Sequence, residues 1–269
     1  KLKKVVGPGM ESSAFKSRNV DKISKMVEDK EFVQASKTWF DLSITHEYSY
    51  HFEWLGLPII QYPQDTLILQ EVIWRVRPDL IIETGVARGG SVIFSASMMA
   101  ILDAVDRAEG HLDSAVTKPQ RHVVGVELDL RQQNREALES HPLGAYVSLI
   151  DGSSTSDSVL REVNAIAKAR NSTKVLVMLD SNHSHDHVLG ELEKYSGLVS
   201  PGSYLVVMDT VIEYLDSRHH NPQRWGKGDN PMTAVEEFLR DNSDFEIDHG
   251  PTDKVMFSVA PRGFLKRIG

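Results

Sequence analysis

The stretch Asp79-Leu-Ile-Ile-Glu-Thr-Gly-Val-Ala-Arg-Gly-Gly-Ser91 is the clearest structural signal in the chain. It begins as a short apolar run, passes through an acid at position 83 and three glycines within six positions, and leads into a helical pattern. A buried strand that ends in a glycine-rich turn and opens a helix is typical of the nucleotide-binding corner of a doubly wound α/β domain. An ordinary strand-to-helix turn that needs glycine would give the same pattern.

Strand and helix patterns alternate on the C-terminal side of this stretch. Apolar runs predict parallel strands at 80–83, 122–127, 146–150, 175–179 and 203–208, and helical periods lie between them at 91–105, 130–138, 156–169 and 188–199. Such alternation requires a parallel sheet covered on both faces. After a helix at 233–240, runs at 245–247 and 254–259 are too close for a crossover and predict an antiparallel hairpin. We therefore expect a doubly wound, Rossmann-like α/β sheet of seven strands.

The N-terminal part has a different character. Residues 1–65 are predicted to form a helical and aromatic extension that caps the domain, and its aromatic segment ends in Gln61-Tyr-Pro-Gln-Asp65. A helical period over 66–76 leads directly into the first strand. The α/β domain is therefore predicted to span 66–269.

Composition excludes several classes of protein and of site. The 269 residues include no cysteine, which rules out disulfides, thiolate metal sites and a cysteine nucleophile. The net charge of −8 argues against nonspecific nucleic-acid binding, which needs a basic stripe. No run is long enough to cross a bilayer and no signal-peptide pattern opens the chain. We expect a cytoplasmic protein with no membrane or nucleic-acid partner, and a homo-oligomer.

Five carboxylates end the five predicted parallel strands, at the edge where ligands of doubly wound sheets gather. They are Glu83, Glu127, Asp151, Asp180 and Asp209. An acid beside the first glycine-rich turn would repel a phosphate, so it favours a cationic or hydroxyl-rich ligand such as S-adenosylmethionine. Any one of these acids could simply end a strand, but all five are harder to explain in that way. The predicted cofactor residues are Glu83, Gly85, Gly89, Ser91, Glu127, Asp151, Ser153 and Asp180.

Two of the positions suggest how a nucleoside would be held. From the end of the second strand, Glu127 could accept hydrogen bonds from both ribose hydroxyls. The segment Asp151-Gly-Ser-Ser154 could admit the adenine ring, with Asp151 accepting from its amine and Ser153 nearby. The same segment could instead be a capping turn for the next helix.

Asp180 and Asp209 are not needed for nucleoside binding. They end neighbouring strands and could converge on one Mg²⁺, which suits a few carboxylates with water and substrate oxygens. A metal there would activate a substrate hydroxyl. The alternative is that both acids accept hydrogen bonds from loop amides.

The segment Asp180-Ser-Asn-His-Ser-His-Asp-His187 contains three histidines, and a histidine can take a proton from a hydroxyl near neutral pH. Alternate spacing cannot bring all three to one site, so the base is predicted to be His183 or His185, with Asp180 also in the catalytic group. A loop at 224–231 offers Trp225, Lys227 and Asn230 as substrate contacts. That loop could be a lid or an ordinary connector.

The chain resembles the cephalosporin hydroxylase and rhamnosyl O-methyltransferase family of class I methyltransferases. The resemblance rests on three long blocks, at 61–91, 175–210 and 225–239. It implies S-adenosylmethionine and a magnesium site, with Asp180 and Asp209 at metal-ligand positions. The family can carry a glutamate directly before Asp209, whereas this chain has Met208, so water, Thr210 or a substrate oxygen would have to supply the third ligand.

Three functions follow from these patterns. The first is Mg²⁺-assisted transfer of a methyl group to a small-molecule acceptor, a hydroxyl of a sugar or of a glycosylated natural product. The second is a hydroxylase or methoxylation component of an antibiotic pathway, which would need two histidines and a carboxylate around iron. The third is a cofactor-binding scaffold without catalysis. The sequence does not identify the acceptor.

Overall fold

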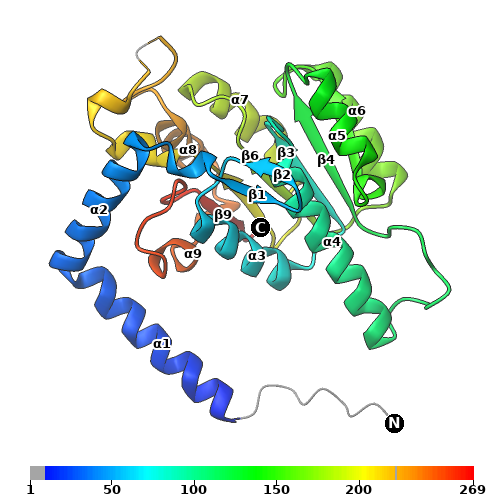
Figure 1. Ribbon diagram of the computed structural model, residues 1–269, viewed down its shortest axis with the longest axis horizontal. Coiled ribbons are helices and arrows are strands. Elements are labelled where there is room, and N and C mark those ends of the chain that lie inside the picture. Colours follow the sequence, from blue (N-terminus) through cyan, green and yellow to red (C-terminus); the bar gives the residue numbers. More distant parts are fainter. Residues whose placement is uncertain (1–9, 222) are drawn as a thin grey trace.

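The computed structural model describes residues 10–221 and 223–269, and its centre is a seven-stranded sheet (Figure 1). The strand order is β5-β4-β3-β6-β7-β9-β8. Strands β3 to β7 are parallel, whereas β9 runs antiparallel between β7 and β8. This confirms the predicted fold class. The strands are β3 (Leu80–Thr84), β4 (His122–Glu127), β5 (Val147–Asp151), β6 (Val175–Leu179), β7 (Tyr204–Val207), β8 (Phe245–Ile247) and β9 (Phe264–Arg267).

The last strand lies further along the chain than predicted. Residues 254–259 form no strand, and β9 begins only at Phe264. A short helix, α9 (Gly250–Asp253), follows β8 instead of a hairpin turn. The apolar residues that suggested a strand are used elsewhere, because Val255 and Val259 pack against the core and Phe257 joins an aromatic cluster with Phe40. The antiparallel pairing of the last two strands was predicted correctly, but the tight hairpin turn predicted between them was wrong.

Helices cover both faces of the sheet, and each face has its own apolar core. Residues of α3 and α4 dominate the core on one face, which also includes Leu138 of α5, whereas α6, α7 and α8 cover the other. In β3, Ile81 belongs to the first core and Leu80 and Ile82 to the second, as the alternation of a strand requires. The helices are α3 (Pro63–Val76), α4 (Gly90–Glu109), α5 (Gln132–Ser140), α6 (Asp157–Ala169), α7 (His185–Tyr195) and α8 (Pro231–Asp241).

The N-terminal segment begins with two helices, α1 (Met10–Glu28) and α2 (Lys30–Thr45). Helix α1 projects away from the body, and α2 leads back toward it (Figure 1). A small antiparallel hairpin follows, β1 (Phe52–Trp54) and β2 (Leu57–Ile59). The hairpin packs on α4, where the Trp54 ring meets Phe94 edge-on at 5.0 Å between centroids. Across the described residues, no helix has the length and apolar character needed to cross a membrane.

The strand order creates a switch point beside β3. The chain moves outward from β3 through β4 to β5, and then returns to place β6 on the other side of β3. The loops after β3 and β6 therefore lead away from each other and leave a crevice at the carboxyl ends of the strands. Ligands of open α/β sheets bind in such crevices.

Candidate functional site

A cavity of about 520 Å³ opens at this switch point. Its floor is formed by the turn after β3 and by the loops after β6 and β7. Its outer wall comes from α2 and from the segment that leads through β2 to α3, including Phe40, Ile44 and Tyr62. Residues of the N-terminal extension therefore line part of the crevice.

Asp180, His183 and Asp209 meet on the floor of this cavity. One potential ligand atom from each lies within 4.8 Å of the others. The Nδ1 atom of His183 is 3.4 Å from Oδ2 of Asp209, and Gln61 Nε2 donates to Oδ2 of Asp180 over 3.1 Å. The two acids predicted as metal ligands are thus brought together.

The backbone fixes the positions of both acids. The amide of Asp180 donates to the carbonyl of Thr84 over 2.9 Å. Gly85 has a φ of +88°, and a Cβ there would lie 2.0 Å from the carbonyl oxygen of Asp180, so only glycine permits this approach. Asp209 itself has a φ of +56°, in the left-handed region that costs free energy for residues with a Cβ. The site is therefore largely formed before any ligand arrives.

The carboxylates at this point repel one another. Burial raises the pKa of Asp180 well above its usual range, and the adjacent Asp209 raises it further. Glu83 and Glu191 are fully buried and act in the same direction. A divalent cation between Asp180 and Asp209 would remove this repulsion, and carboxylate oxygens are the donors that Mg²⁺ and Mn²⁺ prefer. The residues present therefore fit a divalent cation.

The position beside Asp209 that the family can fill with glutamate gives no further ligand. Met208 is buried among apolar neighbours. The hydroxyl of Thr210 donates to the carbonyl of Pro261 over 2.7 Å and is also buried. Thr210, which the sequence offered as a third metal ligand, therefore does not face Asp180 and Asp209. The side chain that lies beside the two aspartates is that of His183.

One of the three histidines in the loop after β6 faces the cavity. His183 lies there with its ring edge-on to Trp225, 6.0 Å between centroids. The Nδ1 atom of His185 is 2.8 Å from the hydroxyl of Thr233, so His185 joins α7 to α8. His187 lies 3.0 Å from the Ser154 hydroxyl. The structure brings His183 to the acids and does not bring His185 there.

The residues predicted from the glycine-rich turn have different positions relative to the cavity. Gly85 and Ser91 line the cavity, but Glu83 is fully buried beneath the turn and accepts hydrogen bonds from Ser91 and, over 3.5 Å, from Ser95. Burial raises the pKa of Glu83 to about 7. Gly89 faces the side chain of Leu138 rather than the cavity. Glu83 therefore supports the turn from below.

The remaining predicted cofactor residues lie beside the cavity, at the ends of β4 and β5. Glu127 Oε2 accepts from the backbone amides of Val86 and Ala87, each over 2.9 Å, which leaves its other oxygen with a weaker contact at 3.3 Å to a nearby amide. Asp151 is exposed and pairs with Arg135 at 2.6 Å. Ser153 exchanges a hydrogen bond with the hydroxyl of Thr155.

The predicted substrate loop contains one residue that reaches the cavity, Trp225. Lys227 is exposed and is not among the lining residues. Asn230 was predicted to contact the substrate, but its side chain is fully buried as the N-cap of α8. Its oxygen accepts from the amides of Met232 and Thr233, and its nitrogen donates to Glu213 and to a backbone carbonyl. No hydrogen-bonding capacity is left for a ligand.

Two polar residues near the acids were not predicted. Gln61 lines the cavity and donates to Asp180, and Glu191 accepts from the hydroxyl of Ser181 over 2.7 Å. The signal for Gln61 was its place in the polar and aromatic segment before α3. The signal for Glu191 was its spacing of four from His187, which puts both residues on one face of a helix.

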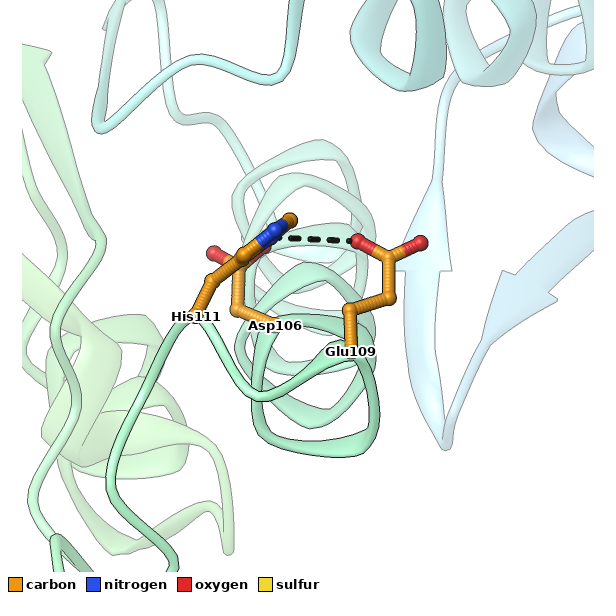
Figure 2. A group of neighbouring side chains, drawn as sticks. All are labelled: Asp106, Glu109 and His111. Carbon is orange, nitrogen blue, oxygen red and sulfur yellow. Dashed lines mark ion pairs between the residues drawn. The ribbon is translucent and has the colours of Figure 1, made fainter. Parts of the chain in front are cut away.

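A second group of acids with a histidine lies at the far end of α4. Figure 2 shows Asp106, Glu109 and His111 close together. Arg77 pairs with both Asp106 and Glu109, and Arg121 pairs with Asp106 at 2.6 Å. The acids are thus neutralised by arginine, and this group does not require a cation.

Comparison with known proteins assigns the chain to a family. The family model described as Rhamnosyl O-methyltransferase/CmcI matches residues 46–268. The chain belongs to this family. Rhamnosyl O-methyltransferase of Mycobacterium leprae is 27% identical over 221 residues, which cover 80% of this chain and 82% of that protein. The enzyme of the same name from Mycobacterium bovis is 28% identical over 215 residues, covering 80% and 77%.

A solved structure of CmcI with Mg and S-adenosylmethionine has a TM-score of 0.52 and 18% identity, covering 82% of this chain and 78% of that one. At this identity the likeness concerns the fold. The family match confirms both the family predicted from the sequence blocks and its methyltransferase class.

Proposed function

We propose that this protein is a Mg²⁺-dependent O-methyltransferase that uses S-adenosylmethionine and acts on a hydroxyl of a sugar or of a glycosylated natural product. The observation that carries the proposal is the meeting of Asp180, His183 and Asp209 in a cavity at the switch point of the sheet. Support comes from the relatives named rhamnosyl O-methyltransferase and from the CmcI structure that contains Mg and S-adenosylmethionine.

Asp180 and Asp209 would hold Mg²⁺, which would supply Lewis acidity, and S-adenosylmethionine would supply an electrophilic methyl group. The protein contributes position and proton transfer. Because Nδ1 of His183 faces Asp209, a proton on Nδ1 leaves the lone pair of Nε2 free to accept the proton of the acceptor hydroxyl. Trp225 and the wall formed by Phe40 and Ile44 would enclose the acceptor and exclude water.

The hydroxylase alternative has less support. A non-haem iron site of the usual kind uses two histidines and one carboxylate. Here the cavity group contains one histidine and two aspartates, because His185 and His187 make their contacts elsewhere.

The decisive experiment measures methyl transfer from labelled S-adenosylmethionine to a panel of rhamnosides and other glycosides, with and without Mg²⁺. We expect product that depends on Mg²⁺ and formation of S-adenosylhomocysteine in equal amount. Oxygen consumption that depends on iron, without methylated product, would favour the hydroxylase instead. Cofactor binding without turnover of any acceptor would favour a scaffold.

A further inference from the structure

Two polar side chains of the segment Gln61-Tyr-Pro-Gln-Asp65 are buried beside the start of α3. Gln61 lines the cavity and donates directly to Asp180. Asp65 makes a different contact, because its Oδ2 atom accepts the backbone amide of Val259 over 3.1 Å. Val259 also lines the cavity and lies between α9 and β9. Asp65 therefore ties α3 to a part of the chain that lies 194 residues later.

The segment that Asp65 holds, residues 258–263, forms a brace against the end of β7. Three hydrogen bonds join the brace to residues on both sides of Asp209. They run from the Val207 amide to the Gly263 carbonyl (2.8 Å), from the Thr210 hydroxyl to the Pro261 carbonyl (2.7 Å) and from the Val211 amide to the Val259 carbonyl (3.1 Å). Asp209 has a φ of +56°, and a residue with a Cβ keeps such a conformation only when its surroundings hold it. The brace supplies contacts of this kind.

The burial of Asp65 is costly. The side chain is 1% exposed, and its Oδ1 atom has no hydrogen-bond partner among the described residues. Burial raises the pKa of Asp65 to about 7, and the charge of Asp209 acts in the same direction. A buried polar atom without a partner costs free energy, so packing alone gives no reason for an acid at this position. The contact that the acid does make is with the brace.

We propose that Asp65 is a positioning residue, which fixes the cation ligand Asp209 in place through the brace. The inference rests on the proposed function. Without an acceptor for the amide of Val259, the brace and the loop that it holds can shift. Mg²⁺ demands near-ideal geometry from its ligands, so a small shift of one carboxylate weakens the site. Groups that orient metal ligands in this indirect way commonly change metal affinity by 10-fold or more.

The test measures cation affinity without turnover. Mn²⁺ is the probe, and the electron paramagnetic resonance signal of the free ion follows its binding to the full chain. Asp65→Ala removes the acceptor, and Asp65→Leu removes it while keeping a branched side chain, so either should weaken Mn²⁺ binding about tenfold. Asp65→Asn keeps an acceptor for the amide of Val259 and should bind Mn²⁺ nearly as the wild type does. S-adenosylhomocysteine affinity, measured by calorimetry, should be unchanged in all of these variants.

Two further variants serve as controls. Asp79→Ala is the matched control, because Asp79 also accepts backbone amides, those of Thr173 and Lys174, but directly precedes β3 at the opposite end of the strands. It should keep wild-type affinity for Mn²⁺. Asp209→Asn removes the ligand itself and gives the level of nonspecific binding. Thermal melting identifies which of Asp65→Ala and Asp65→Leu is folded, and either one is sufficient for the test.

Several outcomes would overturn the inference. Wild-type Mn²⁺ affinity in the folded Asp65→Ala or Asp65→Leu variant would do so and leave the proposed function intact. Asp65→Asn binding as weakly as Asp65→Ala would show that the charge of Asp65 matters rather than its contact with Val259. An equal loss in Asp79→Ala would assign the effect to general destabilisation. Failure of the wild type to bind Mn²⁺ above the level of Asp209→Asn would overturn the proposed function, and this inference with it.

Discussion

The ends of β3, β4 and β5 differ from the ends of β6 and β7 in what surrounds their acids, although every one of these strand ends carries a carboxylate. On the first side each acid has protein partners: Glu83 has serines, Glu127 has backbone amides and Asp151 has Arg135. On the second side Asp180 and Asp209 face each other. The acids on the first side are held by protein groups alone, whereas Asp180 and Asp209 also repel each other. We therefore propose the cation site at the ends of β6 and β7.

Substitutions of the acids at the ends of β6 and β7 should lower activity far more than substitutions elsewhere on the surface. Replacing Asp180 or Asp209 with asparagine should lower kcat on the order of 10³-fold, because several kcal/mol of transition-state stabilisation depend on the cation. S-adenosylhomocysteine affinity should change little. Asp157→Asn, which changes a surface aspartate that pairs with Lys194 at the start of α6, is the matched control and should keep the activity. Full turnover in excess EDTA would contradict the assignment.

The next effect concerns the two histidines that the sequence could not separate. His183→Ala should lower kcat about 10²-fold, since general base catalysis contributes on this order. His185→Ala should keep kcat near the wild-type value, because its ring contacts Thr233 outside the cavity. A loss of Mg²⁺ affinity in His183→Ala, measured by titration, would make His183 a ligand rather than the base.

A smaller effect is expected from Glu127 on the cofactor side. Glu127→Ala should weaken S-adenosylhomocysteine by some tens-fold, or about 2 to 3 kcal/mol, through loss of hydrogen bonds from the ribose. 5′-Methylthioadenosine carries the same nucleoside and sulfur without the amino acid, so its affinity should fall equally. Calorimetry with both ligands checks this. Unchanged affinities would leave Glu127 with only its contacts to the turn.

The smallest effect is on stability. Burial raises the pKa of Glu83 from 4.5 to about 7, so between these values the folded state binds more protons than the unfolded state. Stability contributed by Glu83 is therefore present below pH 4.5 and is lost as the pH rises through 7. Glu83→Gln should remove this dependence, so its stability relative to the wild type should rise by about 2 kcal/mol between pH 5 and pH 8. Urea unfolding at several pH values measures the difference, and a constant difference would show that Glu83 does not titrate in this range.

Sequence patterns predicted the parallel sheet and the placement of the acids because both follow from local information. Each strand is a short apolar run, and each acid directly follows its run. The order of the strands then brings Asp180 and Asp209 together. The last strand was misplaced because an apolar segment can cover a core as well as join a sheet, and Val255 shows the former.

Side-chain direction could not be predicted in the same way. His183 and His185 are two residues apart on one loop, and only the contact of His185 with α8 separates their roles. Asn230 was predicted to contact the substrate because it is a polar residue in a glycine-containing loop, and such loops are commonly exposed. In the structure Asn230 caps α8 and donates a hydrogen bond to Glu213. The contact with Glu213 depends on how the preceding loop folds, which local sequence does not specify.

The outer wall of the cavity has a consequence for how acceptor preference can change. Phe40 and Ile44 belong to that wall, yet they precede the region that the family model matches, which begins at residue 46. The residues proposed to hold the cation and the cofactor lie within the shared region, whereas part of the wall proposed to face the acceptor does not. We therefore expect that replacement of helix α2 would change acceptor preference without changing cofactor binding.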